Sequence, residues 1–287
     1  MRQYALKRQQ VVSALYDIDR QEFDARGVDT YLALADDFLK YFPEAIIFHN
    51  LQSQNEIELL VNKHPKANFV FLPFSKLPLF QYFNEISSAC KFNLESGKSD
   101  LVYKSPKYGI LIHSKFFFLN RAQEIDAAES YTWIDIGIAR FLPSGSAEVN
   151  FGASFLGIAA NKAIFEVDIR RLLNVRHVPA LFKIYLNGLI GSSQRLVSAA
   201  FFSIPGTLLK EFFEYLTFVQ NHWVRAGLWD TEQVLLAKSI SQFSPELILQ
   251  RGENPVTLLN LLIQNVKPRR EFLKKFIAKI LFKTLSN

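Results

Sequence analysis

The sequence predicts an α/β protein with a mostly parallel sheet and helices on both faces. Three observations support this prediction. Short apolar runs alternate along the chain with stretches of helical period, which is the order of elements in α/β folds. The chain has 287 residues, 49% of them hydrophobic and 21% charged, so it can bury a large core. We find no internal repeat and no low-complexity linker in it.

The first third of the chain supplies alternating strand and helix candidates. The expected strands are 11–16, 45–48 and 68–72. The expected helices are 29–42, 54–62 and 77–90. Asp29 can cap the first of these helices and Pro43 stops it, so both of its ends have a local chemical reason.

The rest of the chain continues the alternation after a polar stretch, 93–105, that reads as a loop. Residues 110–120 carry a helical face and lead into a strand around Trp133. Two further strands are expected at 163–167 and 196–202, and two further helices at 207–222 and 231–239. Together these elements predict one α/β domain over residues 1–266.

The most informative motif is Tyr131–Gly137, in which strand-forming residues run directly into Asp135 and Gly137 follows. Ligands of open α/β sheets bind at the carboxyl ends of strands. A glycine there lets the backbone turn without a Cβ near a bound group. A single carboxylate suits a divalent cation, Mn²⁺ or Mg²⁺, that carries a diphosphate, so Asp135 is a candidate metal ligand. The alternative is a buried strand whose last residue caps the next loop.

An acidic tripeptide, Asp17-Ile18-Asp19, follows the first expected strand. At this strand end a carboxylate can accept hydrogen bonds from a ribose hydroxyl or a base N–H. The alternative is a solvated turn. The pattern also fits an aspartate-based phosphatase, in which Asp17 would be the nucleophile. That family continues with glycine or a threonine/valine pair, whereas Arg20-Gln21 follow here, so the phosphatase is the weaker hypothesis.

Three other charged residues are candidates for chemistry. Lys115 precedes the Trp133 strand, where its ammonium can meet a diphosphate; a solvated helix lysine is the alternative. Asp230 and Glu232 open an apolar helix. Acids at a helix start are favourable through capping and the helix dipole alone. They are also the best-placed candidates for a general base that deprotonates an acceptor hydroxyl.

Several common sites are excluded by motif. The chain has no GxxxxGK[ST] loop, GxGxxG fingerprint, GxSxG elbow, HExxH or paired CxxC. Its five histidines lack metal-ligand spacing. Cys90 is the single cysteine, so no intramolecular disulfide forms, and its helical pattern predicts a small core residue.

Taken together, these motifs resemble the HtrL/WlaTC (YibB-like) family of glycosyltransferases, over about residues 11–251. The matching segments are Val11–Arg20 with its acidic tripeptide, Ser114-Lys115, Trp133-Ile134-Asp135-Ile136-Gly137, Gly206-Thr207, and Asp230-Thr231-Glu232-Gln233. The resemblance implies a GT-A-like fold and transfer of a sugar from a nucleotide-diphosphate donor to a hydroxyl of a lipo-oligosaccharide or polysaccharide. The tryptophan-containing segment with the preceding Ser-Lys is the specific part.

The resemblance also implies roles for individual residues. Asp230 or Glu232 is the expected catalytic base, and Gly206-Thr207 the acceptor loop. The expected donor-binding residues are Asp17, Asp19, Lys115, Asp135, Gly137 and Arg140. Many GT-A enzymes bind metal through a DxD motif, but here Gly137 stands where the second aspartate would be. Lys115 or Arg140 is then the expected partner of the leaving diphosphate.

The C-terminal segment 267–287 carries the basicity of the chain. Seven basic residues and one acidic residue fall in it, which accounts for the whole formal net charge of +6. This concentration disfavours a nucleic-acid binder, whose basic residues spread over a domain face. Pro268 stands where a helix can start. At helical spacing one face of this helix is apolar and consists of Phe272, Leu273, Phe276, Ile277 and Ile280. Lys283 also falls on this face, whereas Phe282 does not.

We therefore expect the tail to bind an anionic membrane surface as an in-plane amphipathic helix. No signal peptide and no membrane span is recognisable in the sequence, so the expected location is the cytoplasm, at the inner face of the cytoplasmic membrane. The expected partners are a nucleotide sugar and a lipid-linked glycan acceptor. The competing hypothesis is a non-enzymatic adaptor whose domain binds a protein and whose tail binds lipid. A terminal helix packed on the domain is the alternative for the tail.

Overall fold

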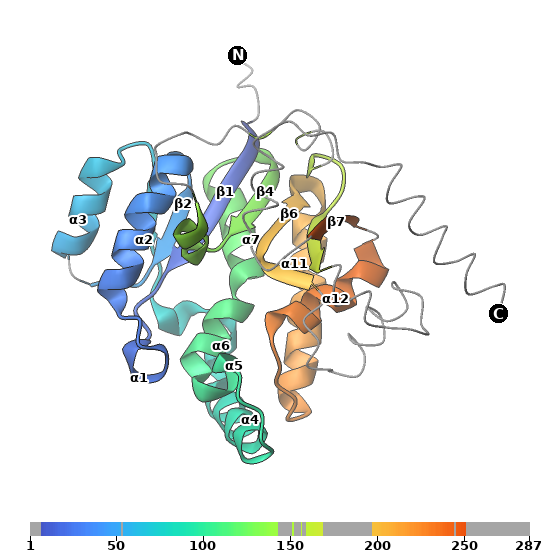
Figure 1. Ribbon diagram of the computed structural model, residues 1–287. Coiled ribbons are helices and arrows are strands. Elements are labelled where there is room, and N and C mark those ends of the chain that lie inside the picture. Colours follow the sequence, from blue (N-terminus) through green and yellow to red (C-terminus); the bar gives the residue numbers. More distant parts are fainter. Residues whose placement is uncertain are drawn as a thin grey trace.

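A computed structural model describes residues 7–52, 54–142, 151, 156, 159–168, 197–243 and 245–250. In these ranges the chain forms a seven-stranded sheet in the order β3-β2-β1-β4-β6-β5-β7 (Figure 1). The strands are β1 (Lys7–Leu15), β2 (Ile46–His49), β3 (Asn68–Phe71), β4 (Ala128–Ile134), β5 (Ile164–Asp168), β6 (Val197–Pro205) and β7 (Glu246–Gln250).

The sheet is mostly parallel, as predicted, with one reversed strand. β1 pairs in parallel with β2 and β4, β2 with β3, and β5 with β7. β6 runs antiparallel to both β4 and β5. Its register places Phe201 opposite Ile134 and Pro205 opposite Ser130. The end of β6 therefore lies beside the beginning of β4, at the edge of the sheet away from Asp135.

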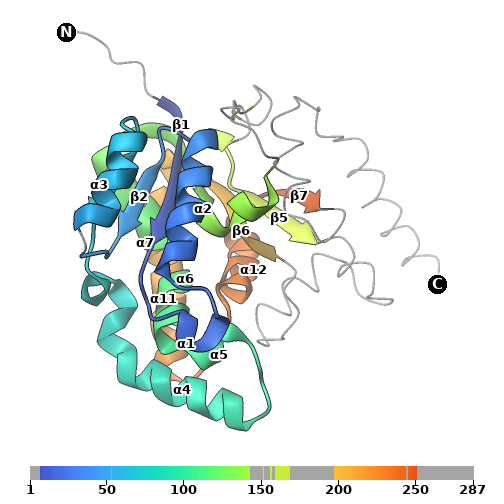
Figure 2. The ribbon, with the colours of Figure 1, turned by 60° about the vertical axis from the view of Figure 1, so that its left-hand side comes forward.

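Helices cover both faces of the sheet, which confirms the predicted α/β architecture (Figure 2). One core lies against α2 (Val28–Tyr41) and α3 (Gln54–Lys63). The second core lies against α4 (Phe83–Glu95), α5 (Leu101–Lys104), α6 (Pro106–His113), α7 (Lys115–Ile125), α11 (Gly206–Arg225) and α12 (Glu232–Phe243). Val11 belongs to the first core and Val12 to the second, because successive strand residues point to opposite faces.

Short elements connect these layers. They are α1 (Gln21–Asp24) after β1, the 3₁₀ helices η1 (Phe74–Lys76) and η2 (Pro78–Tyr82) before α4, and η3 (Ile136–Phe141) after β4. Cys90 is buried on α4, as expected, and burial raises the pKa of its thiol to about 12. It is a core residue, not a nucleophile.

Three expectations about secondary structure were wrong in detail, and one strand was missed. The helix expected over 110–120 breaks at Ser114 into α6 and α7. The stretch 93–105 contains the end of α4 and all of α5, which Asp100 caps by accepting from the Val102 N–H at 3.2 Å. The helix expected over 77–90 begins as 3₁₀ turns and becomes α-helical at Phe83. β7 was not expected at all.

No helix in the described ranges is long and apolar enough to cross a membrane. The segment 267–287, expected to form a basic amphipathic helix, lies outside the described residues. The expected division between residues 1–266 and this tail therefore stays a prediction.

Candidate functional site

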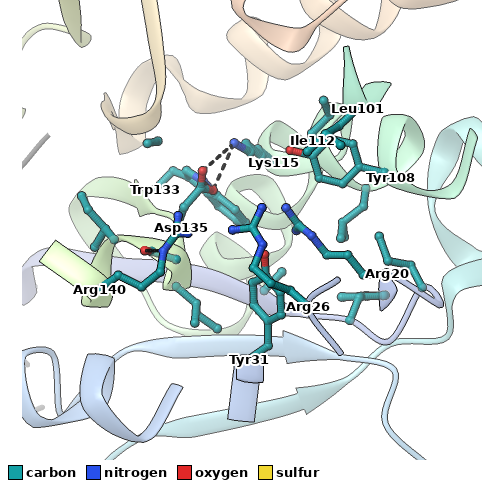
Figure 3. A pocket seen from close by; sticks show the side chains of 18 of the residues that line it. Arg20, Arg26, Tyr31, Leu101, Tyr108, Ile112, Lys115, Trp133, Asp135 and Arg140 are labelled. Atoms are coloured by element: carbon teal, nitrogen blue, oxygen red, sulfur yellow. Dashed lines mark hydrogen bonds and ion pairs between the residues drawn. The ribbon is translucent and has the colours of Figure 1, made fainter. Parts of the chain in front are cut away.

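A cavity of about 280 Å³ opens where β1 and β4 end. The two strands are parallel neighbours, so the segments that follow them meet at one edge of the sheet. Tyr16, Ile18 and Arg20 line the cavity after β1, and Asp135, Gly137 and Arg140 line it after β4. Further walls come from α2, α6 and the start of α7 through Tyr31, Tyr108 and Lys115 (Figure 3).

Lys115 forms the buried side of the site. Its residue is 3% exposed. Its Nζ lies 3.0 Å from Asp135 Oδ1, 3.0 Å from Glu232 Oε1 and 2.9 Å from the Ala199 carbonyl oxygen. An ammonium has three N–H donors, and these three acceptors match them. Burial alone would lower the pKa of Lys115, but the two carboxylates outweigh it and raise that pKa above its ordinary value. Lys115 is therefore charged.

Asp135 is held in one orientation by two donors. Trp133 stands two residues earlier, and its Nε1–H donates to Asp135 Oδ1 at 2.6 Å, while Lys115 holds the same carboxylate. The Trp133 ring is itself stacked on Phe118, with ring centroids 5.8 Å apart. The side chain of Asp135 is 36% exposed and lines the cavity. The expected Trp-x-Asp segment thus fixes a carboxylate at the cavity wall.

Gly137 lines the cavity, but no neighbouring protein atom requires glycine there. A Cβ at this position would meet Arg140 Nη2 at 3.7 Å, which is an ordinary contact.

Three arginines form the open side of the site. The guanidinium carbon of Arg20 lies 4.8 Å from the ring centroids of both Tyr31 and Tyr108. Asp24 accepts hydrogen bonds from Arg20 Nε, at 2.6 Å, and from Arg26. Burial would raise the pKa of Asp24, but these two arginines outweigh it and lower that pKa. The third, Arg140, is exposed, and its Nε donates to the Gly137 carbonyl oxygen at 3.0 Å.

The charge of the lining follows from these residues. Among the described residues of the lining, four side chains are cationic, Arg20, Arg26, Lys115 and Arg140, against the carboxylate of Asp135. The two tyrosines that flank Arg20 stay neutral: burial raises the pKa of Tyr31, and burial, with the charge of Glu232, raises the pKa of Tyr108 to about 12. The cavity is therefore suited to an anionic ligand.

Asp17 and Asp19 do not reach the cavity, contrary to expectation. After β1, Tyr16, Ile18 and Arg20 line the cavity, whereas Asp17 and Asp19 do not. Asp17 is exposed, and its backbone N–H donates to Asn50 Oδ1 at 2.8 Å. Asp19 has a positive φ of 57° and pairs with Lys107. The structure therefore gives no geometric support to Asp17 as a nucleoside contact or as the nucleophile of a phosphatase.

Asp230 and Glu232 have different surroundings although they are two residues apart. Asp230 is buried, and its Oδ1 accepts from the Tyr103 hydroxyl at 3.0 Å and from the Thr231 N–H at 2.7 Å. Its carbonyl oxygen accepts from His113 Nε2 at 2.7 Å. Glu232 instead binds Lys115, at 3.0 Å from its Nζ. Neither residue lines the cavity, so the structure supplies no geometry for either as a base on a substrate there.

Gly206 and Thr207 are far from the cavity, so the structure gives no support to their expected role as an acceptor loop. They open α11 directly after Pro205, which pairs with Ser130 near the start of β4, whereas the cavity lies beyond its end. A Cβ on Gly206 would lie 2.7 Å from the Ala128 carbonyl oxygen. Glycine is thus needed for the close approach of α11 to β4.

The residues present do not fit a divalent cation held by the protein. No cluster of three or more histidine, cysteine, aspartate or glutamate side chains occurs in the described part of the chain. Asp135 is the carboxylate of the lining, and the Lys115 ammonium lies 3.0 Å from it. A cation bound to Asp135 would meet this positive charge at close range. The expected role of Asp135 as a metal ligand is therefore disfavoured by its neighbour.

Comparison with known proteins gives little further information. No protein-family model matches the sequence, and no match is found among curated proteins. One similar solved structure is core-mannan synthase A from Aspergillus fumigatus in its Mn/GDP form. It shares 12% sequence identity, the match covers 87% of this chain and 74% of that one, and the TM-score is 0.45. A similarity this low carries no argument about the site, which we interpret from its own residues.

Sequence reasoning missed Arg20, Arg26, Tyr31 and Tyr108. Arg20 directly follows the acidic tripeptide, but the turn that brings it to the cavity, with Asp19 at positive φ and Arg20 at the start of α1, cannot be read from the sequence. The other three come from a turn and two helices, and no local pattern connects them.

Proposed function

We propose that this protein is a glycosyltransferase that moves a sugar from a nucleotide-diphosphate donor to a glycan hydroxyl. The observation that carries the proposal is the cavity at the ends of β1 and β4, with four cationic side chains and one fixed carboxylate. In such a transfer the acceptor hydroxyl oxygen bonds to the anomeric carbon of the sugar and releases its proton to water, the bond between sugar and diphosphate breaks, and negative charge grows on the departing diphosphate. Cationic groups already positioned around it stabilise that charge.

The same cavity suggests a role for each charged residue in binding or positioning the donor. The arginines face the leaving diphosphate, and Asp135 contacts the donor sugar by accepting hydrogen bonds from its hydroxyls. Lys115 holds Asp135 in its orientation, and Glu232 in turn holds Lys115 in place. Lys115 is thus a positioning residue, because its three donors already have acceptors.

A panel of nucleotides and nucleotide sugars tests the proposal by thermal shift. A ligand that binds the folded state alone raises stability, by about 2.7 kcal/mol at a hundred times its Kd. We expect one nucleotide series to raise the melting temperature, and its sugar conjugate to be consumed in the presence of a glycan acceptor. If no nucleotide stabilises the protein but it binds anionic vesicles, the non-enzymatic adaptor is the better description.

The proposal extends to the membrane through the sequence of the tail. We propose that residues 267–287 dock on the anionic inner face of the cytoplasmic membrane, where a lipid-linked lipo-oligosaccharide or polysaccharide acceptor would be presented. Each basic residue near an anionic surface contributes about 1 kcal/mol, and the apolar face adds to this.

Deleting residues 268–287 tests the tail. The truncated protein should no longer sediment with anionic vesicles, while its melting temperature stays within a few degrees of the full chain. Binding of the full chain should weaken in high salt, because salt screens the attraction. A truncation that melts many degrees lower, from a parent that never bound vesicles, would mean that the tail packs on the domain.

A further inference from the structure

Arg20, Arg26 and Arg140 come from both sides of one cavity. Arg20 and Arg26 flank α1 after β1, and Arg140 lies in η3 after β4. All three line the same space. Figure 3 shows Arg20 and Arg26 extending toward the Lys115–Asp135 pair, with Arg140 on the opposite side of Asp135. A single anion in this space can therefore be approached from two directions.

The arginines have donors to spare. A guanidinium has five N–H donors. The contacts with described residues use Nε of Arg20, an Nη2 hydrogen of Arg26 and Nε of Arg140. Lys115, in contrast, has an acceptor for each of its donors. Of the cations in the lining, the arginines are the ones equipped to bind a ligand.

Arg20 and Arg26 are also held in place before any ligand arrives. Arg20 lies between the rings of Tyr31 and Tyr108, and Asp24 holds it together with Arg26. An arginine fixed in this way loses little conformational freedom on binding, and its planar fork matches two oxygens of a phosphate. A clamped guanidinium pair is thus prepared for a phosphate group.

We propose that Arg20, Arg26 and Arg140 bind the diphosphate of the donor directly, without a divalent cation. The charge that a metal would supply comes from three guanidinium groups, and the place beside Asp135 is taken by Lys115. The identity of the anion as a nucleotide diphosphate depends on the proposed function. The anion site itself depends only on the cavity and its arginines.

Isothermal titration with inorganic pyrophosphate in an EDTA buffer tests the site. The full-length protein should bind it without metal, and added Mg²⁺ or Mn²⁺ should not tighten binding. Arg26→Gln and Arg140→Gln should each weaken binding about tenfold or more, since each removes charged hydrogen bonds. Arg121→Gln is the matched control, because Arg121 is a solvent-exposed arginine on α7 that pairs with Glu124 and does not line the cavity.

Two results would overturn the inference. One is pyrophosphate binding that appears only when a divalent cation is added. The other is unchanged binding by Arg140→Gln. If Arg26→Gln has a lowered melting temperature, pyrophosphate binding by Arg140→Gln still tests the inference, because Arg140 is exposed and its loss should not unfold the protein.

The two proposals fail in different ways. Arginine-dependent pyrophosphate binding in a protein that neither binds nor consumes any nucleotide sugar would overturn the proposed function and leave the anion site standing. Turnover of a nucleotide sugar that requires metal and ignores Arg140→Gln would overturn the present inference and leave the proposed function standing.

Discussion

Two groups of cations face the same cavity, and they differ in how completely their charges are matched. Lys115 is buried and touches two carboxylates and a carbonyl oxygen. On the open side, Arg20 and Arg26 share the carboxylate of Asp24, and Arg140 donates to one backbone carbonyl. A buried cation whose donors are all used stabilises the architecture of a site, whereas a cation with unused donors can bind a ligand. Charge at a site therefore does not by itself identify the ligand-binding residue.

The largest expected effect is on stability, from Lys115→Met. Removing the ammonium leaves Glu232 buried without its partner, and breaking a buried ion pair in this way costs about 3–5 kcal/mol. Urea denaturation measures the loss. The double variant Lys115→Met/Glu232→Gln should recover part of it, because no unpaired buried charge remains. By comparison, Arg140→Gln should change the free energy of unfolding by about 0.5 kcal/mol at most. Equal losses in the free energy of unfolding for Lys115→Met and Arg140→Gln would contradict the distinction between the matched lysine and the arginines.

Asp135→Asn should abolish most donor turnover while leaving the fold intact. The change is nearly isosteric but removes the negative charge, and loss of positioned electrostatics typically costs about a hundredfold or more in rate. Steady-state turnover with the nucleotide sugar identified by thermal shift measures the effect, and the melting temperature shows whether the fold survives. A folded variant with wild-type turnover would exclude Asp135 from the chemistry.

Asp230 and Glu232 should separate stability from rate. Asp230→Ala loses the buried hydrogen bonds from the Tyr103 hydroxyl and the Thr231 N–H and should cost at least ~1 kcal/mol of stability with turnover nearly unchanged. Glu232→Gln should lower turnover by about tenfold or more, because Lys115 can then move away and release Asp135. Melting and turnover are measured for both variants. If both melt lower and turn over normally, the Lys115–Glu232 contact has no part in catalysis.

The smallest expected effect is a pH dependence from His113. This side chain is buried between Trp229 and the Asp230 carbonyl, and burial lowers its pKa. Glu232 favours its protonation and Lys115 opposes it. Below the unfolded value of about 6.5, the unfolded chain binds a proton that the folded protein excludes. Stability should therefore be complete above this pH and fall below it, by at most about 1.4 kcal/mol per pH unit.

His113→Gln should reduce that slope, measured by urea denaturation between pH 7.5 and pH 5. The buried His49, whose pKa burial also lowers, would supply the slope that remains. An unchanged slope in the variant would show that His113 is not the group that titrates.

The fold could be predicted in outline because most helices and strands have a recognisable local sequence pattern. β2, β3 and β5 were each predicted to within one residue of their observed bounds, and β1 and β6 to within four, because β1 opens with the polar residues Lys-Arg-Gln-Gln. β7 was missed because its five residues carry little local signal, and its pairing with β5 joins segments distant in sequence. The break at Ser114 was missed because the apolar face continues from α6 into α7.

The site was only partly predictable, for reasons that differ between residues. Lys115, Asp135 and Glu232 were each suggested by a local motif, but their mutual contact depends on tertiary packing. The acidic tripeptide was misleading, because the chain turns after β1, and Arg20 lines the cavity while Asp17 and Asp19 do not. Gly206 looked functional because its packing against the start of β4 cannot be read from the sequence.

The hydrogen bond between Trp133 and Asp135 gives the protein an intrinsic optical probe. Trp133 lines the cavity, whereas Trp223 and Trp229, the other two tryptophans of the chain, are buried and do not line it. Indole emission responds to nearby charge, so an anion entering in front of Asp135 should change the fluorescence of Trp133 without any added label. Trp133→Phe should remove that change while the other two tryptophans continue to emit, so occupancy of the cavity can be followed in real time.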